Sequence, residues 1–348
     1  MTALDLRARP QHPSGVRGPR SRSRALTAGL VAAAGLLVLM VGLSVAVGSK
    51  PVPLGDVWHA LRSPDGSYAA TVVGSRIPRT QLGLLVGAAL AVSGVVIQAI
   101  TRNPLGDPGL LGVNAGASAS VVVVTALAGA GIGRSVWAAI PGALLAAVAV
   151  YAIGTGRRGP TPVRLVLAGS AISAVLVAVV AAISLTRPEV FDSYRYWVIG
   201  SLAGRSPGTP GQALPFVAAG LVAALLLARP FNALALGDET ATSLGLRAGR
   251  TRAVGALAAT VLAAAAVAAA GPIAFVGLAV PHVVRSFTGA DHRWLLPYCA
   301  LLGPVLLLGA DILGRVVARP GELLVGAVTA FVGAPFLVAA VRRGGSGL

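Results

Sequence analysis

Residues that could carry out chemistry are few in this chain, and most of them stand alone. The sequence has four histidines and a single cysteine, Cys299. A metal site needs several N, O or S ligands close together, and no such grouping is evident. A phosphate-binding loop needs a Gly-Lys pair followed by Ser or Thr, whereas the one lysine, Lys50, lies in GSKPV. The sequence therefore argues against a metal centre, against ATP binding by this chain and against an enzyme.

The eleven acidic residues bear on whether ion gradients drive any transport. Charged groups are costly inside a bilayer and usually mark ion pathways there. Almost all acids fall between apolar runs, and Asp311 and Glu322 come closest to a run, near the expected outer ends of the last two helices. This distribution disfavours an ion-coupled secondary transporter, which stays the alternative class together with a non-transporting membrane scaffold.

One polar stretch, ALALGDETATSLGLRAGRTR at 233–252, stands out among apolar residues. Asp238 and Glu239 suit the positive N-terminal end of a short helix, and Gly245 can end that helix in a left-handed conformation. Such a helix could dock in a groove of a partner. A plain solvated loop is the equal alternative from the pattern alone.

The apolar residues define the elements that must position these groups. The chain is 55% hydrophobic and 11% charged, with a mean hydropathy of +0.82, whereas soluble proteins are about 25% charged. Runs of roughly 17–25 apolar residues predict spanning helices. Ten runs qualify: 26–48, 80–99, 110–130, 135–154, 163–185, 213–228, 253–270, 273–285, 294–310 and 323–341. Pro272 and Pro281 shorten the eighth, so 253–285 also fits one run broken at Gly271-Pro272.

Charge gives the orientation. With ten spans, eighteen of the 28 Lys and Arg residues lie on the side of the termini, so the positive-inside rule places both termini in the cytoplasm. The net charge of +17 then reflects loops and anionic lipid headgroups, not nucleic acid. Residues 1–25, rich in Arg, Pro, Ser and Gly, are expected to form a disordered basic cytoplasmic tail.

Small residues and prolines predict local packing. Gly87, Gly94, Gly112 and Gly116 are expected on helix-packing faces and not in a substrate site. RNPLGDP at 102–108 joins the second and third spans, and its two prolines exclude a continuous helix there.

Several segments together resemble the FecCD family of permeases, the membrane subunits of type II ABC importers for iron-siderophores, haem and cobalamin. In chain order they are RIPRTQLGLLVGAALAVSGVVIQAITRNPLGDPGLLGVNAGA (76–117), YWVIGSLAG (196–204), ALALGDETATSLGL (233–246), GPIAFVGLAVPHVVRSFTGADHRWLLP (271–297), ADILGR (310–315) and GELLVGAVTAFVGAPFLVAAVRR (321–343). The resemblance covers the chain from about residue 25 to its C-terminus.

The resemblance implies an all-α polytopic membrane protein of about ten transmembrane helices, with a permease domain over 26–343 and a possible inverted repeat. It implies a multi-pass protein of the cell inner or plasma membrane. The implied partners are two copies of an ABC ATPase, which carries the ATP and Mg²⁺, an extracytoplasmic substrate-binding protein, and a second permease copy. That second copy makes a homodimer, and a heterodimer with a similar permease is the alternative.

The resemblance also implies roles for individual residues. The loop between the sixth and seventh spans would couple the permease to the ATPase, through Ala235, Leu236, Gly237, Asp238, Glu239, Leu244, Gly245 and Leu246. Arg76, Arg79 and Arg315 match outer arginines that engage glutamates of the binding protein, although they would also fit helix ends without a docking role. Ferric siderophores are the favoured cargo, with cobalamin and haem as alternatives.

Overall fold

The computed structural model describes residues 19–344 except 64, 129–135, 157–158 and 161. Within these residues the chain is almost entirely helical, and each of the ten apolar runs coincides with a helix of its own. The ten helices are α1 (Pro19–Ala46), α3 (Tyr68–Thr101), α4 (Val113–Ala128), α6 (Ala139–Gly154), α7 (Pro162–Thr186), α9 (Thr209–Leu226), α12 (Ala248–Ala270), α13 (Val276–Thr288), α14 (His292–Val317) and α15 (Val325–Gly344). The expected all-α polytopic fold is confirmed.

The ten helices differ in length. Among the described residues, α1, α3, α7, α9, α12 and α14 are long and apolar enough to cross a membrane, and α4, α6 and α15 are shorter apolar helices. The eighth run gives the 13-residue α13. It is separated from α12 at Gly271, whose φ of +81° favours glycine. The run 253–285 is therefore two helices, and the break expected at Gly271-Pro272 is confirmed.

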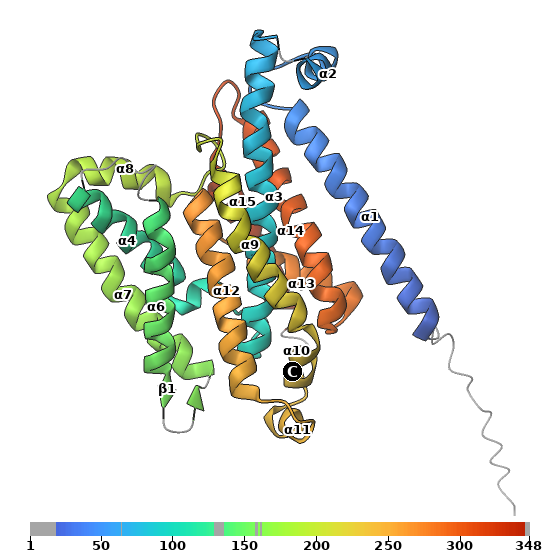
Figure 1. Ribbon diagram of the computed structural model, residues 1–348, viewed down its shortest axis with the longest axis vertical. Coiled ribbons are helices and arrows are strands. Elements are labelled where there is room, and N and C mark those ends of the chain that lie inside the picture. The colour runs from blue at the N-terminus through green and yellow to red at the C-terminus, as the bar shows by residue number, and fades with distance from the viewer. Residues whose placement is uncertain (1–18, 64, 129–135, 157–158, 161, 345–348) are drawn as a thin grey trace, which may run out of the picture.

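Short elements lie at the two ends of the bundle (Figure 1). At one end lie α2 (Leu54–Arg62) and α8 (Pro188–Val198), and we call it the α2 end. At the other, which we call the α11 end, lie α10 (Ala228–Ala235), α11 (Asp238–Ser243) and a hairpin of β1 (Thr155–Gly156) and β2 (Gly159–Pro160). Two single 3-10 turns, η1 (Pro108–Leu111) and η2 (Val136–Ala138), precede α4 and α6.

The N-terminal boundary differs from the expected one. Helix α1 begins at Pro19, so residues 19–25, which the composition assigned to a disordered tail, are helical. Residues 1–18 of that tail lie outside the described residues.

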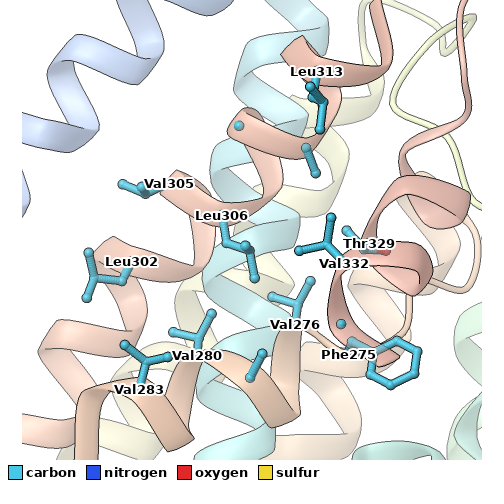
Figure 2. A pocket seen from close by; sticks show the side chains of 14 residues that line it. Phe275, Val276, Val280, Val283, Leu302, Val305, Leu306, Leu313, Thr329 and Val332 are labelled. Atoms are coloured by element: carbon cyan, nitrogen blue, oxygen red, sulfur yellow. The ribbon is translucent and has the colours of Figure 1, made fainter. Parts of the chain in front are cut away.

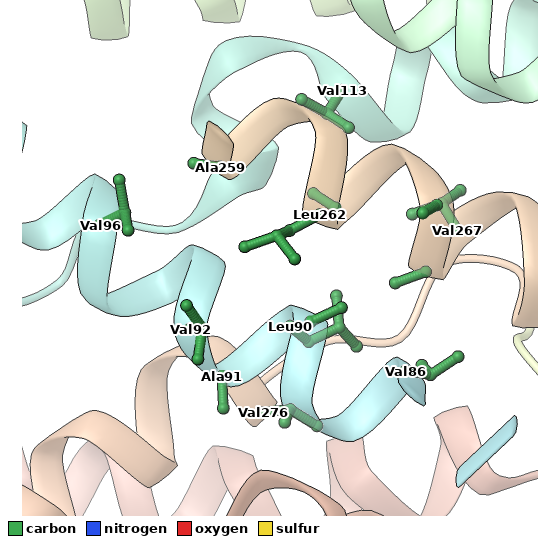
Figure 3. Close-up of a cluster of buried hydrophobic side chains, with 14 of the residues drawn as sticks. Val86, Leu90, Ala91, Val92, Val96, Val113, Ala259, Leu262, Val267 and Val276 are labelled. Carbon is green, nitrogen blue, oxygen red and sulfur yellow. The ribbon is translucent and has the colours of Figure 1, made fainter. Parts of the chain in front are cut away.

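Helix α3 forms the centre of the molecule and packs against α12, α13 and α14. Figure 3 shows its buried side chains beside those of α12 and of Val276 in α13. Its glycines permit this contact: a Cβ added to Gly87 would lie 2.6 Å from the Cα of Pro304, and one added to Gly94 would lie 2.6 Å from the Cα of Gly277. Backbones this close require residues without side chains. The packing role expected for Gly87 and Gly94 is confirmed.

Candidate functional site

Residues 235–246 at the α11 end fold into a unit in which a short helix, α11, lies between two glycines. Gly237 precedes α11 with φ 111° and ψ 157°, a region open essentially to glycine alone. After α11 the N–H of Leu246 donates to the carbonyl of Ala241 at 3.0 Å, and the N–H of Gly245 donates to that of Thr242 at 2.9 Å. With Gly245 at φ +81°, this is a Schellman cap. The short helix and the left-handed end expected from the sequence are both confirmed.

Apolar side chains divide this unit into an attached face and a free face. Ala241 is fully buried and Leu246 packs against the hydrophobic core. Leu236 and Leu244, on either side of α11, are 64% and 66% exposed. Ala235 and Glu239 are also exposed. Two exposed leucines on a polar, capped helix form a surface that a partner can cover.

Asp238 ties α11 to two of the central helices. Both of its carboxylate oxygens accept hydrogen bonds from Arg252 of α12, at 2.9 and 2.7 Å, and one of them also accepts from Arg102 at the end of α3. The hydrogen bonds from Arg252, with the positive charges of both arginines, lower the pKa of Asp238 below its ordinary value. The carboxylate is therefore ionised at neutral pH and holds three helices together.

Helix α10, directly before α11, is joined to the start of α14. The side-chain amide of Asn232 donates to Asp291 at 2.6 Å, and its carbonyl oxygen accepts from the backbone N–H of His292 at 2.9 Å. Asp291 also caps α14 by accepting from the N–H of Arg293 at 3.0 Å. Its hydrogen bonds, the largest from Arg293, lower the pKa of Asp291 to about 2.

The sequence does not reveal these partners of α10 and α11. Arg102 is 136 residues from Asp238, and Asn232 is 59 residues from Asp291. The motif RNPLGDP drew attention to Arg102 only as part of a turn. The sequence does show opposite charges at the ends of successive helices. It does not show which of these charges pair with one another.

At the α2 end, two of the arginines expected to face outward are turned into the protein. Arg76 is 5% exposed and donates to the carbonyls of Val45, Ala46 and Lys50 at 2.6–3.0 Å. Arg315, at 1% exposed, donates to the carbonyls of Ser44 and Val47 at 2.8 and 3.0 Å. Cations bound to the last carbonyls of a helix stabilise that end, so Arg76 and Arg315 hold the end of α1.

Arg79 lies beside them in a network of charges. It donates to both carboxylate oxygens of Asp311, at 3.0 and 2.7 Å, and to Glu322 at 2.6 Å. Asp311 also pairs with Arg315 at 2.7 Å. Asp311 is 0% exposed, so a buried carboxylate is present near the helix end where the sequence placed it, and two arginines neutralise it.

A polar hollow of about 450 Å³ opens among these side chains. Helix α3, residues 48–50 just after α1 and the segment 202–207 contribute to its lining. Five basic side chains contribute to its wall, against a single acidic one, Glu322. The basic residues are Lys50, Arg76, Arg79, Arg205 and Arg315. The hollow therefore attracts anionic groups.

A second hollow, of about 490 Å³, lies between α13, α14 and α15 (Figure 2). Its walls are almost wholly apolar, with Val276, Val280 and Leu306 pointing into it and Thr329 at one side. It offers no charged group. Nor does any group of three His, Cys, Asp or Glu residues with metal-binding spacing occur in the part of the chain that the structure describes.

Comparisons with known proteins place this arrangement in a family. The model of the FecCD transport family matches residues 36–343. The ferric enterobactin transport system permease protein FepD of Escherichia coli (strain K12) is 48% identical over 320 residues, which are 90% of this chain and 95% of that protein. The cobalamin import system permease protein BtuC of Halobacterium salinarum is 40% identical, over 88% of this chain and 86% of that protein.

A solved structure of a metal-chelate type ABC transporter in an inward-facing conformation is also similar. It superposes with a TM-score of 0.80 at 26% sequence identity and covers 91% of this chain and 99% of that one. The family match, the sequence relatives and this structure each extend over most of the chain, and the chain belongs to the FecCD transport family.

Proposed function

We propose that this permease imports ferric siderophores and that α11 receives a separate ABC ATPase. FecCD members are permeases, so the chain is a membrane subunit with no enzymatic activity of its own. The observation that carries the docking proposal is the pair of exposed leucines, Leu236 and Leu244, that flank α11 on its two sides. Exposed apolar groups on a rigid frame favour binding because little conformational entropy is lost on docking.

The cargo proposal rests on the sequence relatives. The identity to the ferric enterobactin permease is 48%, against 40% to the cobalamin permease. Cobalamin stays the second candidate, and haem has less support. An ion-coupled mechanism is disfavoured because Asp311 is held between Arg79 and Arg315.

The orientation follows from docking. If the ATPase binds at α11, that end faces the cytoplasm, and the α2 end faces the binding protein. The chain is a multi-pass protein of the inner membrane, and we place both termini in the cytoplasm on the positive-inside rule. We place two permease copies around a central pathway, with one ATPase on each, and a heterodimer is the alternative.

The binding protein docks, in this proposal, over the polar hollow at the α2 end. Carboxylates on its surface would pair with guanidinium groups there. Of Arg76, Arg79 and Arg315, Arg79 is the one that such carboxylates reach first, since its side chain is 12% exposed and the other two are buried. Arg76 and Arg315, which are buried below the hollow, add to its positive electrostatic potential. They also hold the end of α1 in place beside the hollow.

Substitution of the two leucines tests the docking surface. In Leu236→Ser and Leu244→Ser, we expect the ATPase to co-purify poorly with the permease and uptake of radiolabelled ferric siderophore to fall, with membrane insertion unchanged. The matched control is Leu54→Ser, since Leu54 is 75% exposed at the α2 end. Normal ATPase recovery with both variants would refute docking at α11.

The cargo is tested in the same cells. Iron-starved cells with and without the gene are given labelled iron as catecholate and as hydroxamate chelates, and labelled cobalamin in parallel. Loss of uptake of one iron chelate supports the proposal, and loss of cobalamin uptake alone would overturn it.

A further inference from the structure

Arg102, at the α11 end of α3, has no role in the function described so far. Resting on the proposed docking of the ATPase at α11, we propose that Arg102 is the positioning residue through which α11 moves α3. Arg102 acts in this proposal through Asp238, and the ion pair between them is the joint that transmits displacement from the ATPase to the centre of the permease.

The geometry of Asp238 supports this role. Its carboxylate faces Arg252 with both oxygens, at 2.9 and 2.7 Å, and one of those oxygens also binds Arg102. Arg252 lies only fourteen residues further along the chain, on the next helix, α12. The pair with Arg102 is therefore the polar contact that joins α11 to a helix distant in sequence, and that helix is the central α3.

The backbone at Arg102 gives an independent observation. Arg102 follows the last residue of α3 in the left-handed conformation, with φ 50° and ψ 32°. Glycine is the usual residue there, because a Cβ is disfavoured in that conformation. Phe275 is the one other non-glycine residue with positive φ in the described part of the chain. Local strain retained at a helix end points to a use for the side chain, and the side chain of Arg102 is the one that holds Asp238.

In this proposal, displacement of α3 at Arg102 is transmitted to the opposite end of the helix, at the α2 end. From Arg102 to Arg79 the helix rises by about 35 Å at 1.5 Å per residue, slightly more than the roughly 30 Å of a membrane core. Arg79 binds Asp311 and Glu322 beside the polar hollow. Because α3 packs along its length on α12, α13 and α14, a push at Arg102 shifts a packed unit and not a loose element.

The substitution Arg102→Gly separates this role from a role in folding. Glycine relieves the strained backbone and removes the guanidinium, so the thermal stability of the purified protein should stay the same or rise. In membranes containing the ATPase and the binding protein, stimulation of ATP hydrolysis by the binding protein should fall about tenfold, with Arg102→Lys retaining part of it. Arg250→Ala, at an exposed position of α12, is the control and should keep full stimulation.

A double-mutant cycle decides whether Arg102 acts through Asp238. We expect Arg102→Gly, Asp238→Ala and the double variant to lose stimulation to the same extent, because residues of one network are not additive. Additive losses would show that Arg102 contacts the ATPase by itself and would overturn the proposal, as would full stimulation in Arg102→Gly.

Cross-linking distinguishes failure of the proposed role of Arg102 from failure of the proposed ATPase docking at α11. Ser243→Cys supplies a reactive thiol at the exposed end of α11 and leaves both leucines in place, and the natural Cys299 is buried and stays inert. A cross-link from position 243 to the ATPase, combined with an additive cycle, refutes only the role of Arg102. Absence of the cross-link in the otherwise natural chain refutes both proposals.

Discussion

Arg79 and Asp311, 232 residues apart in sequence, form a two-point ion pair inside the helix bundle, with Nε to Oδ2 at 3.0 Å and Nη2 to Oδ1 at 2.7 Å. Asp311 is also paired with Arg315. The three side chains fasten α3 to α14, and Arg315 extends the attachment to α1. A carboxylate fixed in this way serves the structure.

Removing the charge of Asp311 should destabilise the protein strongly. In Asp311→Asn, Arg79 and Arg315 lose a buried counter-charge, and breaking such a pair costs about 3–5 kcal/mol. We expect a clearly lower midpoint of thermal unfolding in detergent. Asp192→Asn is the control, since Asp192 forms an exposed pair with Arg195, and such pairs contribute little. Equal midpoints for both variants would contradict the structural role.

Glu322 competes with an incoming carboxylate for Arg79. Burial acts to raise the pKa of Glu322, but hydrogen bonds from Ser49 and Arg79 outweigh it and leave the pKa below its ordinary value. The carboxylate is therefore charged at neutral pH. A partly exposed pair is worth about 0.5–1 kcal/mol, so Glu322→Gln should tighten docking of the binding protein about two- to fivefold.

The measurement is the Kd of the binding protein on permease in nanodiscs. Arg79→Gln should weaken docking, and Glu189→Gln, an exposed substitution on α8, should leave the Kd unchanged. A weaker complex with Glu322→Gln would mean that Glu322 itself contacts the binding protein.

We expect Gly237 to be required for coupling of the ATPase to transport because of its backbone conformation, and not because a side chain would lack space. A Cβ at this position would meet nothing closer than the Thr240 hydroxyl at 4.0 Å, yet the φ of 111° is strained by roughly 1–3 kcal/mol for any other residue. We expect Gly237→Ala to shift α11 and to reduce ATPase stimulation and siderophore uptake. Gly249→Ala is the control: its Cβ enters open space within helix α12, and alanine there should be neutral or stabilising.

Asp291 should make stability depend on pH only in acid. Its pKa in the folded protein is about 2, below the ordinary 3.8. A lowered pKa gives stability that is complete above the ordinary value and is lost as the pH falls towards 2. Asparagine also caps helices, so Asp291→Asn isolates the charge.

The check is thermal unfolding of both proteins from pH 7 to pH 3. We expect the difference in midpoint between natural protein and variant to be constant down to pH 5 and to shrink below pH 4. A difference that grows as the pH falls would contradict the lowered pKa.

Much of the fold could be predicted from the sequence because the sequence patterns that specify helices and helix ends span only a few neighbouring residues. The ten helices follow from the lengths of apolar runs, and the break before α13 follows from Gly271 and Pro272. The short helix α11 follows from Asp238, Glu239 and Gly245. Helices α2 and α8 escaped notice because both are short, and their charged and apolar residues alternate around the helix.

The sequence by itself determined the class of the protein, its ten apolar helices and the segment proposed to receive the ATPase, since hydropathy, glycine and helix-end signals act over a few residues. Only the tertiary structure decided which charges meet: Arg102 with Asp238, Arg79 with Asp311, and Arg76 and Arg315 with the end of α1. These contacts join residues far apart in the chain. Ion pairs and caps depend on distances of a few ångströms, which are set by how α1, α3, α12 and α14 pack.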